Sequence, residues 1–570
     1  MNQVTVRIDD KEFSVPEGES LLQTAINNGI DIPHFCYHED LPVGASCRTC
    51  LVEDLKTGRV LTSCSLKAAD GLAVSTRTAK VKKLRLDNLE LLLAGHQDKC
   101  PKCQKGMYCH AAEEFGKYGV TTVKYWRPEI QAKLHKMSQA ALIDPQLCIA
   151  CNKCVEICDK IGIGFLEMRG RNIQNHAAPK NCADIDCIYC GQCTVHCPVG
   201  ATREQDQIAD VEKALADKRK IVIAQMAPSV RASIGEEFGL PPGTDMTGRV
   251  YTAFRKLGFD HVFDVNMGAD ITTVVEAAEL VERIKENKKL PMFTSCCPAW
   301  VKFMEFYHPE MLGHLTTSRS PQMHSGGAYK TWWAAKEKID PRRIVVVSLM
   351  PCTSKKYEAR HKKMKINGMW PVDYVLTTRE FGALLKKHKI NLPKLKPGVV
   401  DEPGTYSGAA AIYGASGGVM ESALRTAAHE LTGQELEKLE FKKVRGMAGI
   451  KRTEVEIAGR KLRVAVVATP ANAEKIIREI KRDPSAYDYI EVMACPGGCI
   501  GGGGQPIPTT LNIVKKRTEA LYKADKKNKL RQAHLNPVVR DFFDNYIAKL
   551  SRRSREAILN TSYSRKKKFE

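Results

Sequence analysis

Several features that decide the class of a protein are absent from this 570-residue sequence. It has no apolar run of 18 residues, so no membrane-spanning helix is expected. Its first ten residues, MNQVTVRIDD, lack the apolar stretch of a secretory signal. It also has no Gly-x-Gly-x-x-Gly in a strand–helix setting, so we expect no nicotinamide site. These absences favour a protein of the reducing cytoplasm without a membrane partner.

Acidic residues are few relative to basic ones. The chain holds 65 Asp and Glu against 87 Lys and Arg, a formal net charge of +22. Such an excess suits nucleic acid or an acidic protein, but the sequence has neither zinc-finger spacing nor a helix-turn-helix signature. We therefore expect no nucleic-acid partner. Hydrophobic residues make up 43%, which is typical of globular domains and excludes a disordered chain.

Cysteine is the residue present in excess. The 21 cysteines fall in tight groups before residue 208 and in three short segments after it. In a reducing compartment, clustered cysteines act as metal ligands or catalytic groups rather than as disulfides. We expect three small cluster-binding modules followed by a large catalytic domain with a basic tail, at residues 1–78, 79–126, 127–207 and 208–570.

The last of these parts alternates short apolar runs with helical patterns. The runs end in Pro, Gly or Cys, as buried strands do, and a helix is predicted over residues 272–287. This alternation predicts α/β architecture with sites at the carboxyl ends of the strands. The predicted strands lie within IVIAQMAPSV (221–230), PMFTSCCPAW (291–300), RIVVVSLMPC (343–352), KLRVAVVATP (461–470) and YIEVMACPGG (489–498).

Two runs share the spacing Cys-x2-Cys-x2-Cys-x3-Cys, at residues 148–158 and 187–197. This is the spacing of bacterial two-cluster ferredoxins, in which the fourth cysteine of each run ligates the other cluster. Structural zinc is the alternative, but zinc favours paired Cys-x2-Cys knuckles. Cys182 stands apart and is expected to be a buried free thiol. We assign one 4Fe–4S cluster to Cys148, Cys151, Cys154 and Cys197, and the other to Cys187, Cys190, Cys193 and Cys158.

The first two modules carry two further ligand sets. Residues 1–78 open with two alternating stretches, VTVRIDD and KEFSVPE, and a helical one, SLLQTAINNG. With the cysteines that follow, this order resembles a plant-type 2Fe–2S ferredoxin with a β-grasp fold, although the first gap is longer than in that family. The second module offers one His and three Cys, which suit zinc or a 4Fe–4S cluster; its neighbours favour the cluster. The two sets are Cys36, Cys47, Cys50 and Cys64, then His96, Cys100, Cys103 and Cys109.

Successive clusters form an electron relay, so the last part must supply a catalytic centre. Its three segments are TSCCPAW (294–300), MPCTSKKYE (350–358) and EVMACPGGCIGGGGQP (491–506). Glycines in the third segment permit close approach of the backbone to a bulky cofactor. The segments offer enough soft ligands for one more cube: Cys297, Cys352, Cys495 and Cys499. The three segments, their order and the modular N-terminus together give a resemblance that covers the whole chain: it resembles the iron-only (FeFe) hydrogenases.

The resemblance implies a two-lobed α/β catalytic domain and an H-cluster, in which Cys499 bridges the 4Fe–4S cube to a diiron subsite with CO, CN and dithiolate ligands. It also implies one 2Fe–2S and three accessory 4Fe–4S clusters. Lys355 would face a cyanide and Glu358 would anchor the loop. The other residues placed around the diiron subsite are Ala227, Pro228, Ser229, Gln322, Met350 and Met493. Core packing is the alternative role of the two methionines.

Cys296 directly precedes a predicted ligand of the cube. Neighbours on an extended chain point in opposite directions, so Cys296 and Cys297 are not both expected to reach it. The resemblance makes Cys296 a proton carrier, and it places Glu276, Glu279, Arg283 and Thr316 on the proton path. Without the resemblance, the three charged residues are typical of a solvated helix face.

The implied function is the interconversion of H2 with protons and electrons. Ferredoxin or sister subunits that oxidise NAD(P)H are the expected partners, and maturation proteins would install the diiron subsite. The alternatives are a subunit of an NAD(P)-linked electron-bifurcating complex, a sensory hydrogenase, an iron–sulfur assembly scaffold, or the large iron–sulfur subunit of NADH dehydrogenase. Asn560 stands where the family is expected to carry His.

The excess positive charge has two expected sources. A 4Fe–4S or 2Fe–2S centre with four thiolates carries about −2, so part of the excess compensates buried clusters. In addition, residues 511–570 hold 17 Lys and Arg against 6 Asp and Glu. We expect this basic tail to dock an acidic electron carrier at a salt-dependent rate.

Overall fold

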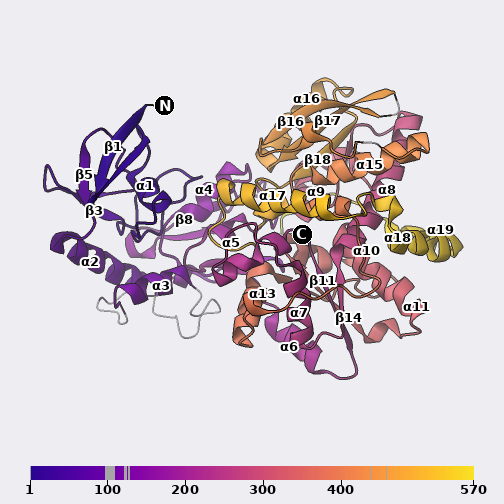
Figure 1. Cartoon of the computed structure of the whole chain (residues 1–570), viewed down its shortest axis with the longest axis horizontal. Helices are drawn as coiled ribbons and strands as arrows, with labels where there is room; N and C mark the ends of the chain where they lie inside the picture. The colour runs from indigo at the N-terminus through magenta and orange to yellow at the C-terminus, as the bar shows by residue number, and fades with distance from the viewer. Residues whose placement is uncertain are drawn as a thin grey trace.

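The structure, a computed structural model of the whole chain, describes residues 2–96, 109–120, 125, 129–436, 438–457 and 459–569. The chain runs from a small sheet at one end of the molecule into a much larger body (Figure 1). Between them lie residues 129–207 with the paired cysteine runs, called the cluster-rich segment below. The predicted combination of α/β and α+β parts is confirmed. In the described part of the chain, no helix is long and apolar enough to cross a membrane.

The N-terminal segment forms a five-stranded sheet of order β2-β1-β5-β3-β4, in which only β1 and β5 pair in parallel. Val4, Val6 and Ile8 of β1 are buried and the residues between them are exposed, as the alternating pattern predicts. The elements are β1 (Gln3–Ile8), β2 (Lys11–Pro16), α1 (Leu21–Asn27), β3 (Leu51–Asp54), β4 (Val60–Thr62) and β5 (Leu72–Ser75).

The segment with the paired cysteine runs repeats one local geometry twice. In each run the residue before the helix is left-handed, Asn152 with φ 66° and Gly191 with φ 71°, which turns the cysteine loop into the helix. The helices are α4 (Lys153–Lys160) and α5 (Gln192–His196), and α2 (Ala79–Gly95) and α3 (His110–Lys117) precede them. The strands are β6 (His135–Met137), β7 (Ala141–Ile143), β8 (Leu166–Arg169), β9 (His176–Pro179) and β10 (Thr202–Glu204).

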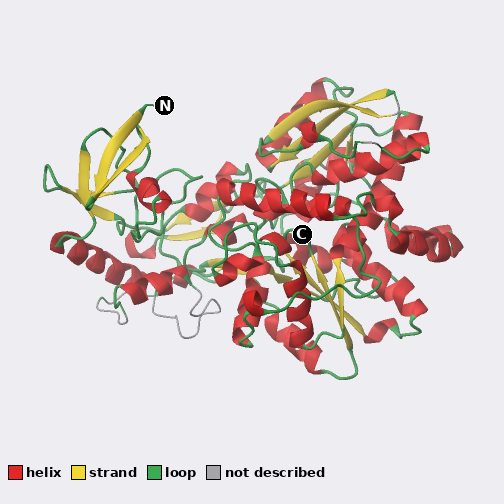
Figure 2. Cartoon of the chain, in the orientation of Figure 1, coloured by secondary structure: helices red, strands yellow, loops and turns green. Residues whose placement is uncertain are grey.

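The large body contains two four-stranded sheets, which form the two predicted lobes (Figure 2). The first is fully parallel, with order β12-β11-β14-β15; the second has order β13-β18-β17-β16 and is parallel except for β16 with β17. All five predicted strands are present. The bounds are β11 (Ile221–Met226), β12 (His261–Asp264), β13 (Met292–Phe293), β14 (Ile344–Met350), β15 (Tyr374–Thr377), β16 (Ile450–Ile457), β17 (Arg460–Ala468) and β18 (Tyr489–Met493).

One long helix, α8 (Val265–Glu286), belongs to the hydrophobic cores of both lobes. Its first half packs Met267 and Ile271 against the first sheet, and its second half packs Leu280 and Ile284 against the second. The other main helices are α6 (Ile208–Ala216), α7 (Thr247–Leu257), α9 (Pro298–Tyr307), α10 (Pro321–Ala328), α12 (Ser354–Ala359), α13 (Thr378–Lys387), α15 (Gly418–Thr432) and α16 (Pro470–Arg482). The predicted helix over 272–287 is therefore longer at its N-terminal side.

The C-terminal segment crosses the molecule rather than extending from it. Helix α17 (Leu511–Lys527) lies across the centre, whereas α18 (Pro537–Asp541) and α19 (Arg552–Leu559) lie at the end opposite the N-terminal sheet (Figure 1). The last residues return, and the Phe569 ring contacts Phe165 of the cluster-rich segment with centroids 6.1 Å apart.

Candidate functional site

A cavity lies between the lobes, where parallel strands of both sheets end. Four loops at carboxyl strand ends line it, after β11, β13, β14 and β18. This is the position at which α/β sheets place their sites. The predicted residues that line it are Ala227, Pro228, Ser229, Cys296, Cys297, Gln322, Met350, Cys352, Lys355, Met493, Cys495 and Cys499.

The four predicted cube ligands gather at this cavity. Burial raises the pKa of Cys352 to about 12, and the nearby thiol of Cys297 contributes to the shift. Burial raises the pKa of Cys495 and Cys499 further, and neighbouring thiols add to it. Three of these cysteines are buried and Cys499 is half-buried. Sulfurs that repel one another as anions are stabilised by a soft metal centre, which needs them deprotonated. The donor set therefore fits an iron–sulfur cube.

Lys355 and Gln322 bring polar groups to this largely apolar cavity. Lys355 Nζ lies 2.9 Å from Glu358 Oε2 and donates to the Cys296 carbonyl at 3.0 Å. Burial disfavours the Lys355 charge, but Glu358 outweighs this effect and the pKa lies above its usual value. Gln322 Nε2 also donates to Glu358, at 3.1 Å. Glu358 thus makes the kind of hydrogen bond expected of a loop anchor, and it also orients two cavity residues.

Two polar atoms on this cavity have no protein partner. Among the described residues, neither Ser229 Oγ nor Gln322 Oε1 has a hydrogen-bond partner, although both atoms are buried. Buried polar groups are ordinarily satisfied, so unpartnered ones at a cavity point to a bound polar group. With Lys355, they fit small anionic or polar ligands such as those of the predicted diiron subsite.

The predicted proton-path residues form a line from the cavity toward the surface. Cys296 and Glu276 are buried, and the negative charge of Glu276 contributes to the raised pKa of the Cys296 thiol after burial itself. Farther along α8, Glu279 Oε1 lies 2.5 Å from Arg283 Nη2, and Glu279 Oε2 accepts from Thr316 Oγ1 at 2.7 Å. Glu276 and Arg283 are 1% and 7% exposed, which rules out a solvated helix face.

The outer end of this line opens on a surface groove. Glu279 and Arg283 line the groove together with charged residues of α19. Asn560 lies there too, and its Nδ2 donates to Thr317 Oγ1 at 2.9 Å. Thr317 Oγ1 in turn donates to Glu279 Oε2 at 3.0 Å. Asn560 therefore supports the outermost carboxylate of the line, a contact that the sequence did not predict.

The paired cysteine runs form two groups with exchanged fourth members. Besides burial, the thiols of Cys151, Cys148 and Cys197 raise the pKa of Cys154. Burial likewise raises the pKa of Cys187, with contributions from Cys190, Cys193 and Cys158. Backbone amides donate to several of these sulfurs, including Thr202 N to Cys197 at 3.4 Å and Phe165 N to Cys158 at 3.3 Å. Each group contains the four cysteines predicted for one cluster, and Cys193 of the second group also lies near Cys154 of the first. The assignment of ligands to two clusters stays a prediction.

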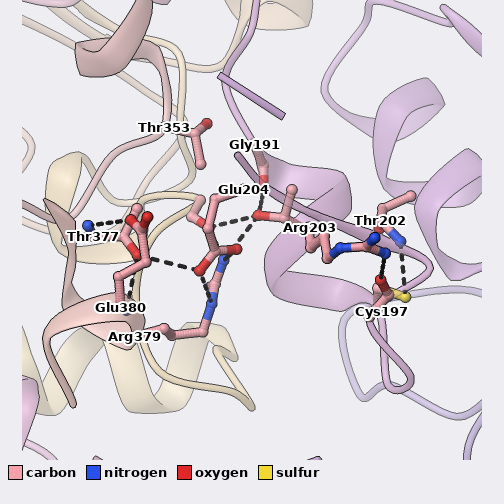
Figure 3. Close-up of polar contacts among 12 residues, drawn as sticks. Gly191, Cys197, Thr202, Arg203, Glu204, Thr353, Thr377, Arg379 and Glu380 are labelled. Carbon is pink, nitrogen blue, oxygen red and sulfur yellow. Dashed lines mark hydrogen bonds and ion pairs between the residues drawn. The ribbon is translucent and has the colours of Figure 1, made fainter. Parts of the chain in front are cut away.

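The second of these groups abuts the cavity cysteines. Besides burial, Cys352 contributes to the raised pKa of Cys190, and Cys190 to that of Cys495. Thr353 Oγ1 donates to the Tyr189 carbonyl at 2.9 Å, directly beside this contact. Figure 3 shows the surrounding polar contacts, in which Arg379 of α13 lies against Glu204 of β10, Nη2 to Oε2 2.7 Å. An electron relay can therefore end at the cavity.

The glycine run after Cys499 serves this junction as well as the cavity. A Cβ on Gly503 would lie 2.4 Å from the Gly191 carbonyl carbon, and one on Gly502 would lie 2.3 Å from the Pro351 oxygen. Gly502 also lines the cavity. The sequence predicted close approach to a cofactor; at Gly503 the close partner is instead the cluster-rich segment.

The remaining predicted ligands lie in the first two modules. Cys36 Sγ and Cys47 Sγ are 3.4 Å apart, and Cys50 and Cys64 form a second interacting pair. His96 is buried, and its Nδ1 lies 2.9 Å from the Leu147 carbonyl, which leaves Nε2 as the nitrogen with the lone pair. Cys109 is buried, whereas Cys100 and Cys103 lie outside the described residues.

Tyr413 and Tyr489 were not predicted from the sequence. Tyr413 lines the cavity and its hydroxyl lies 2.7 Å from Thr273 Oγ1. Tyr489 OH donates to Glu276 Oε1 at 2.5 Å. Tyr413 lies in the otherwise apolar stretch AIYGA, whereas Tyr489 lies in DYIEV beside two acidic residues, and neither stretch carries a recognisable motif.

Comparisons with known proteins agree with this geometry. A family model described as the C-terminal domain of the iron-only hydrogenase large subunit matches residues 220–503. A 2Fe-2S iron-sulfur cluster binding domain matches residues 1–79, and an iron hydrogenase small subunit matches residues 511–566. Together these matches follow the order of the chain's parts.

Relatives of known name span the whole chain. The NADP-reducing hydrogenase subunit HndD of Solidesulfovibrio fructosivorans is 39% identical over 587 residues, 100% of both chains. Iron hydrogenase 1 of Clostridium pasteurianum is 39% identical over 98% of this chain and 100% of its own length. Among solved structures, a variant of apo FeFe-hydrogenase HydA1 from Chlamydomonas reinhardtii has a TM-score of 0.55 and 37% identity, covering 62% of this chain and 98% of that chain. The chain therefore belongs to the iron-only (FeFe) hydrogenases, oxidoreductases that act on H2.

Proposed function

We propose that this hydrogenase works with an electron relay and a proton line that meet at the cavity between the lobes. The observation that carries the proposal is the convergence of four cysteines, Lys355 and Cys296 on that cavity, with Cys190 of the cluster-rich segment close behind. When bound, the H-cluster supplies the redox chemistry that interconverts H2 with protons and electrons. The protein supplies ligands, orientation and routes for both charges.

The relay comprises one 2Fe–2S and three accessory 4Fe–4S clusters on the ligands predicted above. Electrons pass from the modules at residues 1–78 and 79–126 to the module at 127–207, and from there to the catalytic domain at 208–570. The electrostatic effect of Cys352 on the Cys190 thiol supports the last of these steps. None of the described cysteines forms a disulfide, which suits ligand duty in the reducing cytoplasm.

The cavity residues hold the two parts of the cofactor differently. Cys297, Cys352, Cys495 and Cys499 ligate the cube. Lys355, kept charged by Glu358, and Gln322 face the polar ligands of the diiron subsite. The other contacts to this subsite come from Ala227, Pro228, Ser229, Met350 and Met493, which line the same cavity.

Protons move along side chains of α8 and its neighbours. Cys296 exchanges a proton with the cofactor side, and Glu276 is the next carrier because it is buried and electrostatically coupled to that thiol. Glu279, with Thr316 and Arg283, passes the proton to the surface groove. Proton carriers positioned in this way contribute about 10²–10⁴-fold to such reactions.

The external electron partner is ferredoxin or a subunit that handles NAD(P)H. The similarity to a NADP-reducing hydrogenase subunit over the full length supports the second partner. Since the sequence has no nucleotide-binding motif, the isolated chain should exchange electrons with ferredoxin and should not reduce NADP⁺ by itself. Nicotinamide reduction would require the sister subunits.

Replacing Cys296 by Ala tests the proton line. The thiol does not ligate iron in this account, so Cys296→Ala should keep the iron content and lower turnover at least about 100-fold. Cys182→Ala is the matched control, because Cys182 belongs to none of the cysteine groups, and its activity should equal that of the wild type. If Cys296→Ala turns over normally, the proposed proton line is wrong.

A further inference from the structure

Tyr489 occupies a fixed position against the proposed proton carrier Glu276. It is the first residue of β18 and is 0% exposed. Its backbone pairs with Met292 of β13 on one side and Val464 of β17 on the other. A side chain rooted in the middle of a sheet has little freedom to move. Its hydroxyl donates to Glu276 Oε1 at 2.5 Å.

The two oxygens of Glu276 are therefore not equivalent. Oε1 is held by Tyr489, whereas Oε2 is buried and has no hydrogen-bond partner among the described residues. A buried carboxyl oxygen without a partner is costly, and more so when the group is charged, so it indicates a functional role such as proton exchange. The nearby hydroxyl of Tyr413 is engaged by Thr273 at 2.7 Å.

The charged and titratable groups around Glu276 come from every element packed against it. Glu279 and Arg283 face it from α8, Glu491 from β18, and Cys296 and Tyr413 from the cavity wall; Tyr563 faces it from the C-terminal tail. Burial raises the pKa of Glu276 to about 8, although the hydrogen bond from Tyr489 opposes the shift. The carboxylates Glu279 and Glu491 disfavour the ionised form of Glu276, and Arg283 favours it. The hydrogen bond from Tyr489 also favours the ionised form.

We propose that Tyr489 is a positioning residue of the proton path: it fixes Oε1 of Glu276 so that Oε2 alone takes up and releases the proton. On each passage the donor's bond to the proton breaks as an O–H bond forms at Oε2, and that O–H bond breaks as the next carrier binds the proton; no electron is transferred. This inference rests on the proposed function, in which Glu276 carries protons. It adds a residue on β18 to a path otherwise built from α8 and its flanking loops.

Replacing Tyr489 by Phe removes the hydroxyl and keeps the ring. A hydrogen bond to a charged group stabilises it by enough to move its pKa by about one unit or more. In Tyr489→Phe, Glu276 should thus stay protonated to higher pH. The protonated Glu276 carboxyl gives an infrared C=O band, which is assigned by its absence in Glu276→Gln. In the Tyr489→Phe holoenzyme this band should disappear at a pH at least about one unit higher than in the wild type. The pH profile of H2 evolution should shift by the same amount.

Tyr487→Phe is the matched control. Its hydroxyl bonds Glu479 at 2.5 Å rather than Glu276, so neither the band nor the pH profile should move. An unshifted band in Tyr489→Phe, or a rate lowered equally at every pH, overturns the role of Tyr489. In that case an inactive Glu276→Gln variant would still support the proton path. Full turnover in Glu276→Gln would instead remove Glu276 from the path, and the role of Tyr489 with it.

Discussion

Glu276 is a buried carboxyl whose ionisation opposes folding, and the proposed proton path uses it as a proton carrier. Burial raises its pKa to about 8 from an ordinary 4.5. The folded protein therefore binds the proton more tightly than the unfolded chain does. The stabilising effect of protonation is complete below about pH 4.5 and is lost as the pH rises through 8.

Glu276→Gln should remove this dependence. The variant cannot ionise, so its advantage in unfolding free energy over the wild type should grow between pH 5 and pH 8, by up to about 1.4 kcal/mol per pH unit. Thermal unfolding of the cluster-loaded protein in a pH series measures this difference. A constant difference between the two proteins across that range would contradict the buried, proton-binding state of Glu276.

Contacts between elements explain most of what the sequence did not predict. Strands were recognisable because apolar runs end in Pro, Gly or Cys, and ligand groups because cysteine spacing is set by cluster geometry. In contrast, the contacts of Tyr489 with Glu276 and of Asn560 with Thr317 join residues more than 200 positions apart. No local pattern encodes such pairs, because they arise only when separate elements pack. Glu358, three residues from Lys355 on α12, was within reach of a sequence argument.

The glycine run 501–504 joins the catalytic domain to the cluster-rich segment. Gly503→Ala would bring a Cβ to 2.4 Å from Gly191 and force the two backbones apart beside Cys190. H2 evolution driven by an external electron donor should fall about tenfold or more, because a displacement of the two backbones by about 1 Å is enough to slow the reaction to this extent. Exchange of H2 with D2O, which needs no external electrons, should persist.

Gly313→Ala is the matched control for this junction. A Cβ at Gly313 meets nothing within 4 Å, so both activities should remain at wild-type values. If Gly503→Ala lowers evolution and exchange equally, the contact serves the cavity rather than the electron route. If it lowers neither, the backbone contact is not required for either.

The predicted docking tail, residues 511–570, divides its basic residues between buried ion pairs, α19 and the last residues, which return to Phe165. Arg517 and Arg531 are in ion pairs with Glu236 and Asp525, at 2.6 Å each. Helix α19, with Arg552 and Arg553, lies at the end of the molecule opposite the N-terminal sheet (Figure 1). An electron carrier bound at α19 would lie at the opposite end of the molecule from the N-terminal sheet (Figure 1). Residues 1–78 hold 7 Lys and Arg against 11 Asp and Glu, whereas residues 79–126 hold 9 against 5.

An acidic electron carrier should therefore dock near α2 rather than near α19. Reversing the exposed charges of α2, Lys82→Glu with Lys83→Glu, should raise the KM for ferredoxin about tenfold at low salt, with less effect at high salt. Arg552→Glu with Arg553→Glu is the control and should leave this KM unchanged. The opposite result would restore the tail as the docking surface.

The central claim is that the cavity between the lobes holds the H-cluster. The most direct test is the infrared spectrum of the chain after anaerobic maturation, recorded on the wild type and on Lys355→Ala. We predict bands of metal-bound carbonyl and cyanide in the wild type, and weaker or shifted cyanide bands in the variant, because Lys355 faces a cyanide in the proposed function. Absence of these bands from matured wild-type protein with its full content of iron–sulfur clusters would contradict the account.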